Sequence, residues 1–350
     1  MNSFLIVRLG SLGDVVHAIP FAAALRAQFP AARIDWMVDP RYAELLEMVP
    51  LLNRRIGVDP RVLLRHGARR RLFRVLAELR RMQYDVVFDL QGLLKSAVLA
   101  RAVRGQRVVG FSRQYLREPF ARLLYTNTVD PAPATHVIDM NLALLSAVEG
   151  RDRRVRFPLA IPASATADSV AQRFPDGYVL INPGAAWPNK RWPAACFGAV
   201  AAALKDVYGK RSLVLWGPGE HGLAQEVAAA SGGAADVSPP TTIQELAGIA
   251  RAAHLMISGD TGPLHVAAAV GTPIVSLFGP TRPERNGPWA LYDIAISRVD
   301  RCDCVYERRC RRAHARASSD SVPCIMSISV DEVLDAVARR LEAPRFTAGV

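Results

Sequence analysis

The chain has 350 residues, of which 50% are hydrophobic and 22% charged, and its formal net charge is +12. These values belong to a globular protein long enough for two domains of ordinary size, and they exclude a disordered chain. No run of about 18 or more apolar residues occurs, so no transmembrane helix is expected.

The excess positive charge suits nucleic acid, an anionic membrane face or a phosphorylated substrate. Part of it lies between residues 61 and 81, where arginines alternate with apolar residues. From about residue 70 this segment predicts an amphipathic basic helix, whose charged face is either solvated or in contact with anionic lipid headgroups. The first residues do not show the basic, apolar and small-residue segments that follow one another in a signal peptide. We therefore expect a cytoplasmic protein.

The apolar segment 4–9 predicts a first parallel strand, and the polar segment 10–17 predicts a turn that opens a helix reaching about residue 29. Glycines in this turn let the backbone bend at the carboxyl end of the strand, where open α/β sheets bind their ligands. The turn is not the G-x-G-x-x-G pattern of dinucleotide-binding proteins. Asp14 lies at its mouth and is either a helix cap or a general base.

Further strands are predicted at 34–38, 86–90 and 107–111. After the second of these, a polar turn opens an Ala- and Leu-rich helix with Lys95 one turn in. This lysine either reaches a ligand phosphate or carboxylate or is a solvated helix residue. Arg113, Arg117 and Glu118 follow the third strand.

Residues 161–177 lack periodicity and predict an interdomain connection, after which the strand–turn–helix order restarts. We therefore expect one Rossmann-like domain at 1–162 and a second at 175–330. An amphipathic helix within 331–350 is expected to close the chain.

In the second half, polar residues follow the predicted strands at 178–182, 213–216, 254–257 and 274–278. Thr261, Gly262 and His265 lie at or near a helix start, where free N–H groups and the helix dipole favour an anion. The alternative is an ordinary βα turn. Lys190 adds a cation suited to a diphosphate, and Glu220 suits ribose hydroxyls.

Five segments occur in the order and spacing of a known family. The segments are Gly10-Ser11-Leu12-Gly13-Asp14, Gln91-Gly92-Leu93-Leu94-Lys95-Ser96, Arg117-Glu118-Pro119, Lys190-Arg191-Trp192 and Ser258-Gly259-Asp260-Thr261-Gly262-Pro263-Leu264-His265. With them the chain resembles the ADP-heptose:lipopolysaccharide heptosyltransferases of glycosyltransferase family 9 over nearly its whole length. The second and third segments are most similar to the heptosyltransferase I branch.

The resemblance implies the α/β GT-B fold, with two Rossmann-like domains facing across a cleft and a C-terminal helix returning to the first. It implies inverting transfer of a heptose from ADP-L-glycero-D-manno-heptose to the Kdo region of lipid A, in lipopolysaccharide inner-core synthesis. Asp14 is then the base and Lys190 stabilises the leaving diphosphate. Asp260 is implied to hold heptose hydroxyls, and Glu220 the ribose.

The resemblance also implies the remaining site residues and partners. The enzyme is expected on the cytoplasmic face of the inner membrane, bound peripherally to its anionic surface, without nucleic acid, metal or other cofactor. The donor set is Glu220, Thr241, Asp260, Thr261, Gly262 and His265, and the acceptor set is Ser11, Gly13, Lys95, Arg113 and Arg117.

Two features depart from the family pattern. Ala185 and Ala186 stand where heptosyltransferase I has hydroxyl residues that contact phosphate. The second is a C-x-C segment followed by two further cysteines, with five and thirteen residues between them. This spacing is not that of a standard zinc finger. It predicts either reduced structural cysteines or a metal or redox site. The cysteines are Cys302, Cys304, Cys310 and Cys324.

Other functions are also compatible with the sequence at this point. One is another sugar-nucleotide transferase of family 9, similar to heptosyltransferase II, and another is a non-catalytic protein that binds a nucleotide sugar or a polyanion. A Rossmann oxidoreductase is disfavoured by the first turn.

Overall fold

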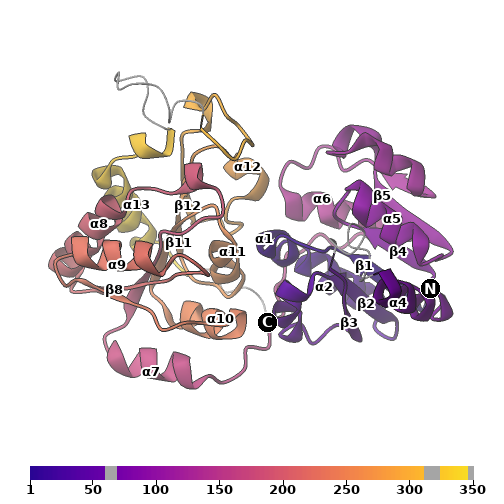
Figure 1. Ribbon diagram of the computed structural model, residues 1–350, viewed down its shortest axis with the longest axis horizontal. Coiled ribbons are helices and arrows are strands. Elements are labelled where there is room, and N and C mark those ends of the chain that lie inside the picture. The colour runs from indigo at the N-terminus through magenta and orange to yellow at the C-terminus, as the bar shows by residue number, and fades with distance from the viewer. Residues whose placement is uncertain (60–68, 311–323, 346–350) are drawn as a thin grey trace. The chain divides into compact units, whose positions relative to one another are not determined.

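The computed structural model describes residues 1–59, 69–310 and 324–345, and the chain divides after Ala160 into two compact units (Figure 1). Unit 1 begins at Met1 and unit 2 at Ile161. Each contains one parallel six-stranded sheet with helices packed on it. The expected pair of doubly wound α/β units is therefore confirmed.

Unit 1 follows the chain from strand to helix repeatedly. Its elements are β1 (Ser3–Val7), α1 (Leu12–Val16), α2 (Ile19–Gln28), β2 (Arg33–Val38), η1 (Pro40–Tyr42), α3 (Ala43–Glu47), β3 (Arg54–Gly57), α4 (Arg69–Arg81), β4 (Val86–Asp89), α5 (Leu94–Ala102), β5 (Arg107–Phe111), η4 (Arg113–Tyr115), η5 (Pro119–Leu124), β6 (Asn127–Val129), α6 (Val137–Ala143) and η6 (Leu144–Val148).

Unit 2 repeats the same alternation. Its elements are α7 (Ala165–Arg173), β7 (Tyr178–Asn182), η7 (Pro188–Lys190), α8 (Ala194–Tyr208), β8 (Arg211–Val214), α9 (His221–Ala230), β9 (Ala235–Val237), α10 (Ile243–Ala252), β10 (Leu255–Gly259), α11 (Gly262–Ala269), β11 (Ile274–Phe278), α12 (Pro283–Asn286), β12 (Ile294–Ser297), η8 (Val299–Arg301), η11 (Cys324–Ser327) and α13 (Val330–Glu342).

The strand orders are β3-β2-β1-β4-β5-β6 in unit 1 and β12-β11-β10-β7-β8-β9 in unit 2. Numbered from the first strand of each unit, both are 3-2-1-4-5-6, the order of Rossmann folds. The central strands are buried along their whole length, as parallel strands covered on both faces must be. The order reverses between β1 and β4 in unit 1, and between β7 and β10 in unit 2. Ligands of open α/β sheets bind at such switch points, beyond the carboxyl ends of the strands.

The strands that sequence reasoning missed are β3, β6, β9 and β12, which form the outer edges of the two sheets. Each has only three or four residues, and β3, β6 and β12 are mostly half-buried or exposed. An edge strand packs fewer apolar residues than a central one, so its sequence carries little strand pattern.

The prediction of a single helix over 10–29 is also wrong. The segment forms two helices, α1 and α2, because Pro20 in the first turn of α2 lacks the N–H that would continue α1.

The segment 161–177 is not a plain connection, which corrects the expectation above. Ser164 accepts the N–H of Ala167 at 3.2 Å and begins α7, whose buried Val170 faces its own unit. Helix α7 packs against α10. The helix was missed because its short sequence contains a single strongly apolar buried residue.

The C-terminal helix α13 packs against α8, β11 and β12, so the expectation that it returns to the first domain is wrong. Val333, Ala336 and Val337 belong to the core of unit 2. On the same helix Arg340 pairs with Asp293, with Nε 2.8 Å from Oδ1 and both side chains 1% exposed. The apolar face of α13 is therefore already used within unit 2.

The predicted basic helix is α4, although residues 60–68 of that segment lie outside the described part of the chain. Leu76 and Leu79 are buried, whereas Phe73 is 66% exposed. Within the described residues, no helix combines the length and apolar character needed to cross a bilayer.

Candidate active site

Asp260, the first residue after β10, is the centre of a buried polar cluster in unit 2. Its Oδ2 lies 2.5 Å from Nζ of Lys190 and accepts the hydroxyl of Thr281 at 2.7 Å. Asn286 Nδ2 is 3.1 Å from both carboxylate oxygens, and His265 Nε2 is 3.3 Å from Oδ1. These contacts use essentially all the acceptor positions of one carboxylate.

Burial alone would raise the pKa of Asp260, but the hydrogen bond from His265 and the charge of Lys190 outweigh it and hold that pKa far below its ordinary value. The carboxylate is therefore ionised at neutral pH. With Asp260 ionised, Nε2 of His265 carries the proton that it donates. Lys190 is held as a cation at the switch point of the sheet.

The backbone explains why Lys190 reaches Asp260. Strands β7 and β10 are neighbours, and the loop after β7 contains η7, which ends at Lys190. A Cβ on Gly259 would lie 2.8 Å from the carbonyl oxygen of Lys190, so only glycine admits this close approach. Asn182, at the end of β7, donates Nδ2 to Ser258 and Thr261 hydroxyls, both at 3.0 Å, and so ties the two strand ends together.

Helix α11 begins beside this cluster. Thr261 is its N-cap, but the Thr261 side chain makes no cap hydrogen bond, and its hydroxyl instead meets Asn182. The N–H groups at the start of α11, near Gly262, therefore have no side-chain cap from Thr261. Together with the helix dipole they favour an anion. His265 projects from the first turn of the same helix toward Asp260.

Glu220 lies in the loop after the neighbouring strand β8, at the N-cap of α9. Its Oε2 accepts the N–H of Gly217 at 3.1 Å, and its Oε1 is 3.4 Å from Nη2 of Arg191. A Cβ on Gly184 would lie 2.0 Å from Oε2 of Glu220, so Gly184 makes room for the carboxylate beside the loop that follows β7. Glu220 is thus held beside the Lys190 loop, with a side chain that is 19% exposed.

A tryptophan in the same loop attracts two cations. Nζ of Lys190 lies 4.7 Å from the ring centroid of Trp187, and Cζ of Arg308 lies 5.9 Å from it. Both distances are in the range of cation–π attraction. Arg191 Nε also donates to the carbonyl of Ala185 at 2.9 Å, so the backbone oxygen at that position already has a partner.

Thr241 does not share these contacts. The neighbouring Thr242 is the N-cap of α10 and forms a capping box with Glu245. The Glu245 carboxylate also accepts the hydroxyl of Thr166, at 2.5 Å. These hydrogen bonds serve the start of α10 and involve Thr242, not Thr241.

In unit 1, Asp14 lies in the first turn of α1, which follows β1 at the switch point between β1 and β4. Its Oδ1 is 2.5 Å from Nη2 of Arg8, and its Oδ2 accepts the N–H and the hydroxyl of Ser11, both at 2.9 Å. Burial tends to raise the pKa of Asp14, but the Arg8 charge and the Ser11 hydrogen bonds lower it below its ordinary value. The side chain is still 38% exposed, so Asp14 both caps α1 and remains within reach of a ligand.

The turn after β4 is organised by a second carboxylate. Asp89 accepts the hydroxyls of Ser96, at 2.9 Å, and Tyr125, at 2.8 Å. Gln91 Oε1 accepts the N–H of Leu9 at 2.9 Å and so joins this turn to the turn after β1. The turn that leads to Ser11 and the turn that leads to Lys95 are therefore bound to each other.

The predicted acceptor cations Lys95, Arg113 and Arg117 are all exposed. Within the described part of the chain, none of these three side chains forms an ion pair with an acid. Glu118 instead accepts the N–H of Leu94 at 2.6 Å and caps α5. The Arg-Glu-Pro segment thus ties η5 to the start of α5.

Exposed apolar side chains accompany these cations. On η5, Phe120 is 73% and Leu123 78% exposed, and α5, which packs against η5, exposes Leu94 and Val98. We call these four residues the apolar surface of unit 1. Exposed apolar side chains grouped beside cations are characteristic of surfaces that bind a partner or a membrane.

The structure brings Lys190, Asp260, His265 and Thr281 together and places Glu220 beside the same loop. Sequence reasoning missed three contributors: Arg8, Asn182 and Asn286. Arg8 and Asn182 end or follow a central strand, which is a signal that a search for polar residues at strand ends would have found. Asn286 lies in the short helix α12 and has no such signal.

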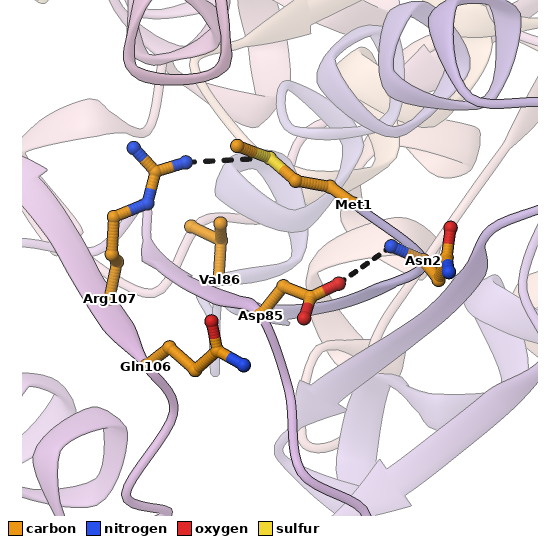
Figure 2. Close-up of a pocket in the computed structure, with 6 residues that line it drawn as sticks. All are labelled: Met1, Asn2, Asp85, Val86, Gln106 and Arg107. Atoms are coloured by element: carbon orange, nitrogen blue, oxygen red, sulfur yellow. Dashed lines mark hydrogen bonds between the residues drawn. The ribbon is translucent and has the colours of Figure 1, made fainter.

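A pocket of about 310 Å³ lies at the opposite edge of the first sheet (Figure 2). It is lined near the amino ends of β1, β4 and β5, where Asn2 N–H donates to Asp85 Oδ2 at 2.6 Å and Arg107 contacts Sδ of Met1 at 3.4 Å. Because ligands of parallel sheets bind at the carboxyl ends, this pocket is not the candidate site.

Comparison with known proteins gives a consistent result. Residues 70–315 match the family model described as glycosyltransferase family 9 (heptosyltransferase). The chain is 30% identical to lipopolysaccharide heptosyltransferase 1 of Pseudomonas aeruginosa, covering 87% of this chain and 86% of that protein. It is 28% identical to the Salmonella typhimurium protein of the same name, over 83% and 92% of the two chains.

Solved structures agree in fold. Escherichia coli heptosyltransferase WaaC with ADP superposes with a TM-score of 0.75 at 23% identity, covering 97% of this chain and 99% of that one. A family 9 glycosyltransferase from Veillonella parvula gives a TM-score of 0.75 at 24% identity, with 97% of both chains covered. The GT-B class expected from the sequence is confirmed. From the family model and the curated relatives together, the chain belongs to glycosyltransferase family 9, the heptosyltransferase family.

Proposed function

We propose that the chain is an inverting heptosyltransferase that moves a heptose from ADP-L-glycero-D-manno-heptose to a Kdo hydroxyl of a lipid A-type acceptor in lipopolysaccharide inner-core synthesis. Relatives at 28–30% identity are named lipopolysaccharide heptosyltransferase 1. A solved structure with the same fold is described as WaaC with ADP-2-deoxy-2-fluoro heptose. The observation that carries the proposal is the Lys190–Asp260 pair at the switch point of unit 2.

The donor's diphosphate requires fixed positive charge, because negative charge grows on it as the sugar leaves. Lys190 and the start of α11 supply such charge in one buried cluster, and His265 lies beside them as a hydrogen-bond donor. Donors that are already oriented cost little reorganisation during the reaction, and each contributes about 3 kcal/mol to lowering the barrier. Glu220, in the loop after the adjacent strand, is the group suited to accept the vicinal hydroxyls of the ribose.

Asp260 takes a different part from the one that the resemblance implies. Its carboxylate oxygens are already engaged by four side chains, so a sugar hydroxyl would have to displace one of them. We therefore assign Asp260 to orienting Lys190 and His265. Contact with heptose hydroxyls is secondary to that positioning.

Asp14 is proposed as the general base. An Asp14 carboxylate oxygen takes the proton from the acceptor hydroxyl, and the acceptor oxygen bonds to the anomeric carbon as the bond from that carbon to the ADP oxygen breaks. ADP leaves with the bonding electron pair, and the configuration of the sugar inverts. The ionised state of Asp14 at neutral pH supports this role, since the base must be free of a proton.

The acceptor proposed here has phosphate and carboxylate groups beside acyl chains. Lys95, Arg113 and Arg117, together with the apolar surface of unit 1, offer the complementary combination of cations and exposed apolar side chains. We propose that this surface contacts the acceptor headgroup and the anionic inner face of the inner membrane, so that the enzyme acts as a peripheral protein.

A nucleotide screen tests the donor class. Thermal stabilisation of the full chain by ADP, UDP, GDP and their sugars follows mass action, so the nucleotide that fits the site raises Tm most. We expect ADP and ADP-heptose to raise Tm, with a smaller rise in Lys190→Ala. A selective response to UDP would overturn the heptose assignment.

A further inference from the structure

Four of the five cysteines meet in unit 2, next to the Lys190 loop. Sγ of Cys302 lies 3.5 Å from Sγ of Cys304. The Cys302 thiol also interacts electrostatically with Cys324, and the Cys304 thiol with Cys310. All four are free thiols, so the cluster is not a disulfide framework.

The cluster is enclosed by the protein. Cys304, Cys310 and Cys324 are buried, with exposed fractions of 8% or less, and Cys302 is partly buried. Cys302 follows η8, and Cys324 begins η11, so the cluster includes thiols from both of these segments. Burial of a single thiol is ordinary, because a free cysteine packs as a small apolar residue, so it is the grouping of four thiols that points to a shared ligand.

We propose that Cys302, Cys304, Cys310 and Cys324 bind one tetrahedral metal ion, zinc or ferrous iron, as a structural site. Four sulfur ligands in tetrahedral geometry are typical of these ions. Metal–sulfur bonds of about 2.3 Å place neighbouring sulfurs about 3.8 Å apart, close to the separation found between Cys302 and Cys304.

The cysteine side chains must move from their present positions before all four sulfurs can bind one ion. Among the residues that the structure describes, no three His, Cys, Asp or Glu side chains already surround a metal-sized point. Binding replaces each S–H bond with an S–metal bond and releases each thiol proton to solvent. Four thiolates and a divalent ion leave a net charge of −2, and the sequence places Arg301, Arg308 and Arg309 beside the ligands.

The site would brace the loop that carries Lys190. Asn189, the residue before Lys190, directs Nδ2 toward Sγ of Cys304 at 3.9 Å and donates to the carbonyl of Glu307 at 2.9 Å. A Cβ on Gly279 would lie 3.3 Å from Sγ of Cys324, so the end of β11 packs directly on the cluster. A bound ion would therefore hold two loops of the donor site in place, and this consequence rests on the proposed function.

Metal content of the full chain tests the site independently of transfer. The protein is purified without chelator, and zinc and iron are measured by elemental analysis before and after a mercurial reagent titrates the thiols. We expect one ion per chain, released as the cluster thiols react. Cys304→Ser and Cys324→Ser should lose the ion, whereas Cys196→Ser, which changes the lone cysteine of α8, should retain it.

Cobalt provides a second readout if a serine variant fails to fold. Chain reconstituted with Co²⁺ should show the intense visible absorption of tetrahedral cobalt and a thiolate-to-cobalt charge-transfer band in the near ultraviolet. A wild-type chain that holds no ion after reconstitution with zinc or ferrous iron, or in which Cys302 and Cys304 are joined as a disulfide, would overturn the proposal.

Removal of the ion also tests the bracing role. We expect the metal-free chain to show a lower Tm and a several-fold higher KM for the donor, both restored by adding the metal back. An ion that is present but leaves donor KM unchanged on removal would retain the metal site and refute the link to the Lys190 loop. Loss of all transfer activity in a fully loaded chain would instead count against the proposed function.

Discussion

Nζ of Lys190 lies 2.5 Å from Oδ2 of Asp260, although 70 residues separate the two in sequence. The contact exists because β7 and β10 are neighbours at the point where the strand order reverses, and because Gly259 lets the Lys190 backbone approach. It places a cation at the ligand end of the sheet and keeps it in a single position. The donor half of the proposed reaction depends on this pair.

Replacing Lys190 with alanine should reduce transfer strongly. Removing one preorganised donor from a developing anion lowers kcat by about 10²–10³-fold. Steady-state kinetics of ADP release, with and without acceptor, would measure the loss. Lys210→Ala is the matched control, because Lys210 lies before the amino end of β8, where it donates to the carbonyl of Asp176. Similar losses in both variants would contradict the role given to Lys190.

Asp260→Asn should destabilise unit 2 in a pH-dependent way. The pKa of Asp260 is lowered in the folded chain, so the carboxylate adds stability above its unfolded pKa of about 3.9, and this contribution is lost as pH falls through the lower folded pKa. The Tm difference between the wild type and the variant should stay constant from about pH 5 to 8 and shrink at more acid pH. A difference that instead grew on acidification would be incompatible with an ionised, hydrogen-bonded Asp260.

Ser11→Ala should shift the acid limb of the activity profile upward. The Ser11 hydroxyl donates to Asp14 and helps to lower the pKa of that carboxyl, so its removal brings the pKa back toward its ordinary value of about 3.9. Because Asp14 must be ionised to act as a base, kcat/KM should begin to fall at a higher pH in the variant. The pH profile of kcat/KM measures this shift, and an acid limb that is identical in both proteins would show that Asp14 does not control it.

Arg340→Met should destabilise the chain by about 3–5 kcal/mol, because it leaves the buried Asp293 carboxylate without its charged partner. Urea unfolding followed by fluorescence would measure the change. Arg339→Met, one residue earlier and exposed, should change stability little. A small effect of Arg340→Met would mean that α13 is not anchored in unit 2 through this pair.

Much of the site was visible in the sequence because its polar residues follow apolar strand segments. Lys190, Glu220, Asp260 and Thr281 all stand after central strands, and parallel strands bring such residues to one edge. What the sequence did not show is how they pair. Asp260 was expected to hold sugar hydroxyls, yet its oxygens are engaged by neighbours from three other segments of the chain.

The remaining errors have physical causes. The edge strands carry too few buried residues to show a period, and Pro20 divides a helix that is apolar throughout. The closing helix was expected on the first domain from the family resemblance. Its own pattern of Val333, Ala336 and Val337 matches the core of unit 2, but a helical period shows only that a face is buried and not what covers it.

The most direct test of the central claim is the transfer rate of Asp14→Asn, measured beside its affinity for ADP. Asparagine keeps the size of the side chain but cannot take a proton from the acceptor, so transfer should fall by about 10²–10⁴-fold. The rise in Tm caused by ADP should be unchanged, since Asp14 belongs to unit 1 and the proposed diphosphate site to unit 2. An Asp14→Asn chain that transfers heptose at the wild-type rate would contradict the account.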